Sequence, residues 1–394
     1  MRKEEPVAVT GMGALCALGP DIPAIERGLY RQERSLSPAA TLSEDALPFP
    51  FYSAPQTAWN GKGRQGSAAD TLRLGMLAAT QAMAQAQWQD ASRTAVIAGT
   101  TSGSALHFLE GYRRRHENAG VSEDCADYLD CNPALTLGET FQARGPLLTI
   151  SNACTSGADA IGMGIDLIRS GQTDTALCGG MDALSLVPHT GFARLMVYDD
   201  EPCRPFDARR KGLNLGEGAA FLCLESLRKA RRRGATILGY VLGYGSHSDA
   251  YHFTSPHPEG EGLAGAMRDA LTQAGLQETD LAFVNVHGTG TKENDRIEGK
   301  TLAHALPGVP LWASKALTGH TLGAAGALEA VFTLIALSRG VVPASVGFAE
   351  QDPEIGVSPL REPLAIAKKN ALSTSLGFGG SNAALALSTE CDHD

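Results

Sequence analysis

The chain has 394 residues, 43% of them hydrophobic, and a formal net charge of −10 at pH 7. This length suffices for two to three domain-sized units, and the acidic balance argues against nucleic acid as a general partner. The N-terminal sequence MRKEEPVAVTG lacks the apolar core of a secretory signal, and no run of 18 apolar residues follows, so we expect no membrane span. The eight cysteines lack metal-ligand spacing, which predicts reduced thiols in a cytoplasmic protein without a metal site.

The first half of the chain alternates short apolar runs with helical patterns. We predict strands at Val7–Thr10, Thr94–Ala98, Leu147–Ile150, Thr175–Met181 and Ala219–Glu225. We predict helices at Ile22–Arg31, at Asp70–Gln87 and from the turn after Ile150 to Ser170. Residues 32–66 are expected to form a loop, because turn-forming residues dominate them, and residues 188–216 are expected to hold a loop that contains CRPFDARRKGLNLGEG.

The first strand ends in Gly11-Met12-Gly13, which is similar to part of a dinucleotide-binding fingerprint. Cys16 occupies the position of the third glycine, and no acidic residue follows a second strand at the required distance. We therefore expect no dinucleotide site here.

The second half repeats the order of the first. Predicted strands lie at Ile237–Tyr244, Ala282–Val286, Leu311–Ser314, near Ala344 and at Ala383–Leu387, and predicted helices lie at Leu263–Ala274 and up to about Ser338. AVIAGTTSG parallels FVNVHGTGT, TISNACTSGADA parallels WASKALTGHTLGAAGA, and GEGAAFLCLES parallels GGSNAALALS. This order predicts an α/β fold of two similar βαβ-rich halves, residues 1–235 and 236–394, packed about a pseudo-twofold axis.

One stretch, Leu147–Ser170, combines a short β-branched run, a turn and a helix that is apolar on nearly every face. The run predicts a buried strand. Each glycine within the helix lowers helix stability by roughly 1 kcal/mol relative to alanine, which suits a place where another backbone approaches closely. Cys154 lies at the start of this helix, where unpaired N–H groups and the helix dipole favour a reactive thiolate. The alternative is an inert, buried structural cysteine.

Five motifs occur in a fixed order along the chain: NACTSG around Cys154, SDAYHFTSP at 248–256, VHGTGTKENDRIE after the strand at 282–286, SKALTGHTLGAAGALE, and LGFGGSN at 376–382. Together they resemble the elongating β-ketoacyl-acyl carrier protein synthases of the thiolase fold, of the KAS I/KAS II type, over essentially the whole chain. The resemblance implies an acyltransferase with a five-layered α-β-α-β-α arrangement.

The resemblance also implies the roles of several residues. Cys154 would accept an acyl group, and the acyl-Cys would condense with malonyl-acyl carrier protein after loss of CO₂. Neutral His287 and His320 would donate hydrogen bonds to the enolate oxygen, and Lys315, paired with Glu329, would hold charge near them. The acyl oxygen would bind the backbone N–H groups of Cys154 and Phe378. Phe378, in the loop with Gly377 and Gly379, would also gate the acyl pocket.

Further residues have supporting roles by the same resemblance. Asp295 and Glu298 would pair internally and order the His287 loop. Thr289, Thr291 and Thr254 would contact the phosphopantetheine arm, although turn chemistry is an equal reading of the first two. Ser102 would lengthen the acyl pocket because it is small. The acidic carrier protein would meet a local basic patch of Arg194, Lys62 and Arg64, with Arg209, Arg210 and Lys211 as further candidates.

Substrates would arrive on the phosphopantetheine of acyl carrier protein, and no cofactor would be bound by the enzyme itself. Cys391 lies in a polar tail, which argues against a thiolase, and His320 in the third catalytic position argues against the starter-type Cys-His-Asn class. Type II fatty acid synthesis is the expected pathway, with a homodimer as the assembly. The alternative is a ketosynthase of a specialised polyene or polyketide pathway, paired with a chain-length-factor-like subunit. A non-catalytic scaffold subunit is the remaining reading.

Overall fold

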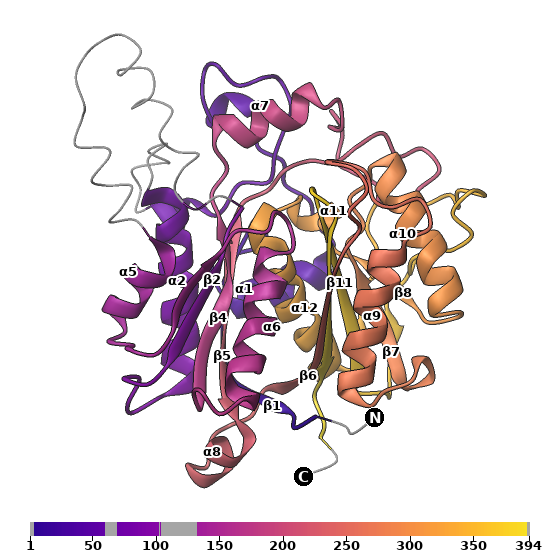
Figure 1. Ribbon diagram of the computed structural model, residues 1–394. Helices are drawn as coiled ribbons and strands as arrows, with labels where there is room; N and C mark the ends of the chain where they lie inside the picture. The colour runs from indigo at the N-terminus through magenta and orange to yellow at the C-terminus, as the bar shows by residue number, and fades with distance from the viewer. Residues whose placement is uncertain (1–3, 60–68, 102, 104–131, 392–394) are drawn as a thin grey trace.

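The computed structural model describes residues 4–59, 69–101, 103 and 132–391. Within them, ten strands form one mixed sheet in the order β3-β2-β4-β5-β1-β6-β12-β11-β7-β8 (Figure 1). The strands of the first half are β1 (Val7–Leu15), β2 (Ala95–Gly99), β3 (Leu147–Ile150), β4 (Thr175–Asp182) and β5 (Gly218–Ser226). Those of the second half are β6 (Gly239–Ser248), β7 (Leu281–Val286), β8 (Leu311–Ala313), β11 (Asn370–Gly377) and β12 (Ser381–Ser388). The short strands β9 (Val341–Val342) and β10 (Leu364–Ala365) pair separately.

The two halves of the sheet have the same topology. In the first half β3, β2 and β4 run parallel and β5 and β1 follow antiparallel; in the second half β8, β7 and β11 run parallel, and β12 and β6 follow antiparallel. The halves join where Val7–Val9 of β1 pairs with Gly239–Val241 of β6. The sequence parallels therefore match β2 with β7, β3 with β8, and β5 with β12, while the boundary at residue 235 stays a prediction.

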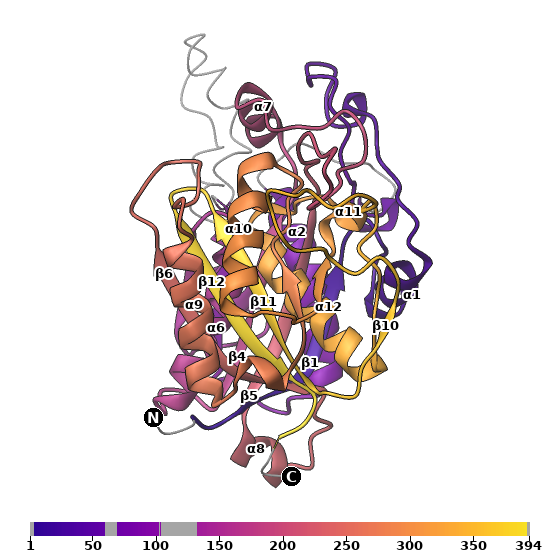
Figure 2. The ribbon, with the colours of Figure 1, turned by 90° about the vertical axis from the view of Figure 1, so that its right-hand side faces the viewer.

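Helices form three layers around these two halves. The central layer is α6 (Ser156–Arg169) with α12 (Ala325–Arg339), and each contacts strands of both halves. One outer layer is α2 (Ala69–Ala86) with α5 (Pro133–Thr140), and the other is α9 (Glu261–Ala274) with α10 (Lys292–Ala305) (Figure 1). In the turned view α9 and α10 lie in front of β11 and β12 (Figure 2). This is the expected five-layered α-β-α-β-α arrangement.

The remaining helices are short: α1 (Ile22–Arg31), α7 (Leu186–Arg194), α8 (Leu227–Arg232) and α11 (Lys315–Thr318). The stretch Leu322–Arg339, which includes α12, is long and apolar enough to cross a membrane, but 89% of it is buried inside the protein. Its apolar character is explained by packing between the two halves of the sheet.

The glycines of the Gly11-Met12-Gly13 stretch serve helix packing. Both lie within β1, which continues through them to Leu15. A Cβ on Gly11 would lie 2.2 Å from the carbonyl oxygen of Ala82, and one on Gly13 would lie 2.0 Å from that of Ala78. These residues therefore let α2 approach the strand, which explains the motif without a dinucleotide.

One local expectation is wrong, and several elements were not predicted. β3 was expected to be buried, but it is the edge strand of the sheet, and Leu148 is 37% exposed. Helix α7, which precedes the predicted loop, was not predicted; its His189 contacts the Phe49 carbonyl at 3.1 Å, so packing overrides a sequence poor in helix formers. Helix α10 and strand β11 were not predicted, because buried polar side chains obscure their apolar periodicity.

Replacement of Gly162 tests the close packing of α6. A Cβ there would lie 2.4 Å from the Tyr244 ring, which is held by a 2.7 Å hydrogen bond from its hydroxyl to Asp159. Where a helix has space for the methyl group, alanine is more stabilising than glycine by about 1 kcal/mol, but here the clash with Tyr244 should dominate. We therefore expect Gly162→Ala to lower the free energy of unfolding by about 1–3 kcal/mol, measured by urea denaturation. Met163→Ala, at an exposed position of the same helix, is the control; a stabilised Gly162→Ala variant would contradict the model of packing.

Candidate active site

Cys154 lies in a tight turn between β3 and α6. Ala153, which precedes it, has a φ of 48°, a left-handed conformation that non-glycine residues rarely adopt. The Asp159 carboxylate accepts hydrogen bonds of 2.7 Å from both the Asn152 amide and the Thr155 hydroxyl, and so holds the turn. Strain at this position is compensated by these buried bonds, which present the Cys154 sulfur at the start of the helix.

The thiol of Cys154 is protonated at rest. Its residue is 5% exposed, and burial raises its pKa to about 12. The positive charge of Lys315 and the backbone N–H of Phe378 oppose this shift without cancelling it. The pKa of Cys154 is thus raised and not lowered as expected for a helix start, because removal of the sulfur from water disfavours the thiolate.

His320 directly contacts the nucleophile. Its Nε2 lies 3.0 Å from the Cys154 sulfur, and its Nδ1 accepts a 3.3 Å hydrogen bond from the backbone N–H of Leu322. An accepting Nδ1 places the imidazole proton on Nε2, which then points at the sulfur. Burial first, and then the charge of Lys315, lower the pKa of His320 well below its ordinary value, so the ring is neutral at physiological pH.

His287 has the same protonation state for a related reason. The ammonium group of Lys315 donates to its Nδ1 at 3.2 Å, which leaves the proton of the neutral ring on Nε2. Burial, Lys315 and His320 all lower the pKa of His287. The two rings stand nearly perpendicular at 87°, with centroids 5.1 Å apart, so the site contains two neutral imidazole donors.

Lys315 is buried between His287 and Glu329. It is 1% exposed, and its ammonium group also contacts the Glu329 carboxylate in a short ion pair. Burial raises the pKa of Glu329 to about 7, and the charge of Lys315 opposes that shift. The positive charge of Lys315 lies beside His287, where it disfavours the imidazolium form.

Asp295 and Glu298, both on α10, fasten the loop after β7. Glu298 accepts the backbone N–H groups of His287 at 2.7 Å and Gly288 at 2.8 Å. Asp295 accepts those of Thr289 at 3.1 Å and Gly290 at 3.1 Å. The carboxylates do not pair with each other; each orders the His287 loop directly.

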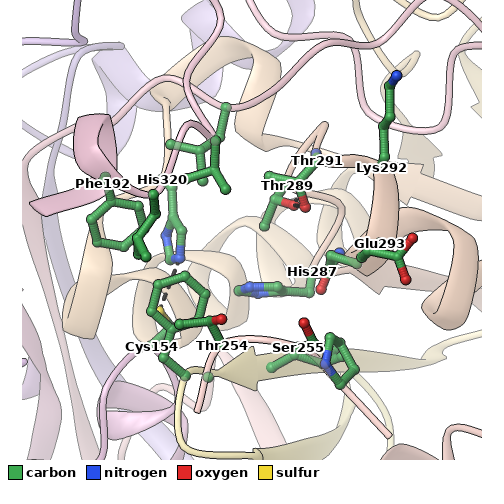
Figure 3. Close-up of a pocket in the computed structure, with 18 of the residues that line it drawn as sticks. Cys154, Phe192, Thr254, Ser255, His287, Thr289, Thr291, Lys292, Glu293 and His320 are labelled. Carbon is green, nitrogen blue, oxygen red and sulfur yellow. Dashed lines mark hydrogen bonds between the residues drawn. The ribbon is translucent and has the colours of Figure 1, made fainter. Parts of the chain in front are cut away.

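A cavity of about 350 Å³ leads to these groups (Figure 3). Cys154, His287, His320, Gly377 and Phe378 are among the residues that line it. The ring of Phe378 stacks on Phe192 of α7 at 5.2 Å, and Phe192 meets His320 edge-on. Phe192 was not predicted from the sequence; the available signal was an aromatic residue two positions before Arg194.

The loop after β11 approaches the nucleophile closely. A Cβ on Gly377 would lie 3.3 Å from the backbone nitrogen of Cys154 and 2.3 Å from the Ser381 hydroxyl. Gly379 has a φ of 87°, which favours glycine. The loop therefore brings the Phe378 N–H beside the Cys154 sulfur, and the predicted oxyanion role of these two N–H groups stays a prediction.

The three predicted arm-binding threonines all line the cavity, but not on the same side. The hydroxyls of Thr289 and Thr291 lie 2.9 Å apart, whereas Thr254 lies on the other side of His287 (Figure 3). Their role in binding stays a prediction.

The predicted carrier-protein patch is only partly described. Arg194 is exposed at the end of α7, whereas Lys62, Arg64 and Ser102 lie outside the described residues. Arg210 is excluded as a surface residue, because it is 5% exposed and bonds to Asp352 at 2.6 Å. Among the described residues, all six cysteines are free and no cluster of three potential metal ligands occurs.

Two topologically equal halves, with catalytic groups that meet at their pseudo-twofold axis, define a condensing enzyme of the thiolase fold. The chain belongs to the β-ketoacyl synthase family. Residues 4–230 match the model of the beta-ketoacyl synthase N-terminal domain, and residues 238–349 match that of the C-terminal domain. The resemblance stated from the motifs is thereby confirmed.

Relatives with different roles match this chain. The 3-oxoacyl-[acyl-carrier-protein] synthase 2 of Mycobacterium tuberculosis is 36% identical over 76% of this chain and 75% of its own. The tetracenomycin polyketide synthase ketoacyl synthase alpha subunit of Streptomyces glaucescens is 32% identical over 98% of this chain and 97% of its own. A chain of the ishigamide ketosynthase/chain length factor superposes with a TM-score of 0.89 at 29% identity, over 98% of this chain and 100% of its own.

The raised pKa of Cys154 predicts a pH dependence. Below a pKa of about 12 the thiolate fraction rises about tenfold for each pH unit. We expect the rate of iodoacetamide alkylation at Cys154, followed by peptide mass spectrometry, to climb by that factor from about pH 6 to 9 without a plateau. Free cysteine, with a pKa near 8.5, serves as the control. A plateau of the alkylation rate for Cys154 below pH 8 would mean that the helix start lowers the pKa of this thiol more than burial raises it.

Proposed function

We propose that this ketosynthase catalyses decarboxylative Claisen condensation of an acyl-Cys154 enzyme with malonyl-acyl carrier protein. The observation that supports it is the 3.0 Å contact between the Cys154 sulfur and His320 Nε2, with the His287 ring 5.1 Å beyond, in a cavity open to a substrate arm. A nucleophile and two neutral donors are what acyl transfer followed by enolate formation requires.

The first step is acyl transfer to Cys154. The Cys154 sulfur attacks the thioester carbonyl, the carbon–sulfur bond to the carrier arm breaks, and the thiol proton ends on the departing arm sulfur. The Nε2–H of His320 and the N–H of Phe378 point at the Cys154 sulfur and stabilise its developing charge. The backbone N–H groups of Cys154 and Phe378 then bind the oxyanion of the tetrahedral intermediate.

The second step begins with malonyl-acyl carrier protein. The bond to the carboxylate breaks, CO₂ leaves, and the electron pair forms an enolate whose oxygen accepts hydrogen bonds from His287 and His320. The enolate carbon attacks the acyl-Cys carbonyl, and the carbon–sulfur bond to Cys154 breaks with its electron pair on the sulfur. The resulting thiolate takes up a proton from solvent and so restores the resting thiol. The product is a β-ketoacyl thioester two carbons longer. The two neutral imidazoles only donate hydrogen bonds in this step and keep their protons.

Separate assays of the two half-reactions test these roles. Intact-protein mass spectrometry with a panel of acyl carrier proteins should show an acyl adduct on wild type and none on Cys154→Ala. His287→Ala should keep this adduct and lose about 10²–10³ in malonyl decarboxylation. His320→Ala should impair both steps, since His320 contacts the sulfur. Wild-type decarboxylation by both histidine variants would refute the assignment.

We further propose that the pathway is type II fatty acid synthesis, in the cytoplasm and without a bound cofactor. The 36% identity to a 3-oxoacyl-[acyl-carrier-protein] synthase supports this pathway. The second candidate is a specialised polyene or polyketide pathway with a chain-length-factor-like subunit, supported by relatives that match almost the whole chain. In the adduct panel, saturated chains would favour the first pathway, whereas polyunsaturated or polyketide chains would favour the second.

The edges of the sheet support a dimer. At the edge of the second half, Ser345 and Leu360 hydrogen-bond to β8, so another segment of the same chain covers this edge strand. The equivalent strand β3 has no such cover among the described residues, and Leu148 is exposed there. An open edge strand is a template for pairing with another chain, so we propose that β3 meets β3 of a second copy or of a related subunit.

A charged side chain on β3 should prevent this pairing. We expect wild type to elute at twice 41.2 kDa by size exclusion with light scattering, and Leu148→Glu to elute as a monomer, because a carboxylate is costly to bury unpaired. Val187→Glu, also at an exposed apolar position, is the control and should stay dimeric. A dimeric Leu148→Glu variant would exclude this edge as the interface.

A further inference from the structure

Two lysines line the active-site cavity without a role in the chemistry above. Besides the catalytic groups, the ionisable residues on its lining are Lys211, Asp249, Lys292 and Glu293. Asp249 accepts from the backbone of His257 and the side chain of Asn382, at 3.0 and 2.9 Å. Glu293 accepts from Arg296 at 2.8 Å. The acidic groups of the lining are thus engaged in local structure.

The lysines are less engaged. Lys211 approaches Asp200 only to 3.8 Å, and both side chains are more than half exposed, so water weakens that pair. Lys292 forms no ion pair with any carboxylate of the described residues. The cavity therefore presents two ammonium groups that are free to meet an anion.

A buried arginine ties the two lysines together. Arg210 precedes Lys211 in the chain, and its guanidinium donates to the backbone carbonyl of Lys292 at 3.1 Å. The same guanidinium donates to Asp352 at 2.6 Å, and its side chain is 4% exposed. The neighbouring backbones are also close, because a Cβ on Gly290 would lie 2.6 Å from the carbonyl oxygen of Gly212. The segments that carry the two lysines are therefore adjacent in the cavity wall.

That part lies away from the nucleophile. In Figure 3, Thr289 and Thr291 lie between Cys154 and Lys292, and the Lys292 side chain points away from the sulfur. A substrate arm with its thioester at Cys154 would pass the threonines and end near the lysines. A carrier-bound arm carries an anionic phosphate at the end opposite its thioester.

We propose that Lys211 and Lys292 bind the phosphate of the phosphopantetheine arm, an inference that rests on the proposed use of carrier-bound thioesters. Lysine presents a compact charge on a flexible stem, which suits a phosphate that enters from solvent. The pair supplies local positive charge in a chain whose net charge is −10, and so favours an anionic substrate at the place where it must dock.

Soluble arm analogues that differ only in the phosphate test this site. Acyl-4′-phosphopantetheine and acyl-pantetheine are compared as donors to Cys154 by intact-protein mass spectrometry. For wild type we expect the phosphorylated donor to be preferred about tenfold in rate at low salt, falling as ionic strength screens the charges. In Lys211→Gln/Lys292→Gln the phosphorylated donor should fall to the level of the unphosphorylated one. Lys300→Gln, exposed on the same helix but outside the cavity lining, should retain the preference.

A binding readout separates this proposal from the proposed function. Protection of Cys154 from iodoacetamide by 4′-phosphopantetheine and by pantetheine measures arm binding without any acyl transfer. If acylation fails with both donors while the phosphorylated arm still protects Cys154 at about tenfold lower concentration than pantetheine, the proposed reaction is refuted and the phosphate site is retained. Equal protection by the two arms, or a preference that persists in the double variant, would overturn the phosphate site.

Discussion

Helices α6 and α12 pack against each other between the two halves of the sheet, and the catalytic geometry depends on this contact. A Cβ on Gly157 of α6 would lie 2.8 Å from the Gly323 carbonyl, which shows how closely the two segments approach. Each helix follows the equivalent strand of its half, so the pseudo-twofold axis brings their starts together. Cys154 precedes one helix and His320 precedes the other. A sulfur and an imidazole 166 residues apart in sequence therefore meet at 3.0 Å.

Burial then decides the charge state of each group in this contact. The thiol and both imidazoles are neutral because the surrounding protein disfavours charge, and Lys315 adds to this effect for the imidazoles. Glu329 compensates the one buried ammonium group. Neutral donors fixed in place are suited to an oxyanion that exists only during the reaction, since they need no reorganisation when the charge appears.

The two halves share a topology but have diverged in what they contribute. The first half provides the nucleophile and, among the described residues, an uncovered edge at β3, and the second provides both histidines, Lys315 and an edge covered by its own chain. Acidic side chains of α10 hold the catalytic loop of the second half, whereas Asp159 of α6 holds the turn of the first. The shared topology thus forms the frame, and different polar contacts in each half form the reacting site.

The sequence by itself determined the family, the strands of both halves except β11, and Cys154, His287 and His320 as the candidate reacting groups, because hydrophobic periodicity and short motifs are local properties of the chain. Tertiary structure decided that β3 is an edge, that α7 brings Phe192 over the site, and that burial raises the pKa of Cys154. These properties depend on residues far away in sequence. A pKa follows the dielectric and charges that surround a group, and an edge exists only where no other strand arrives, so neither can be deduced from a local pattern.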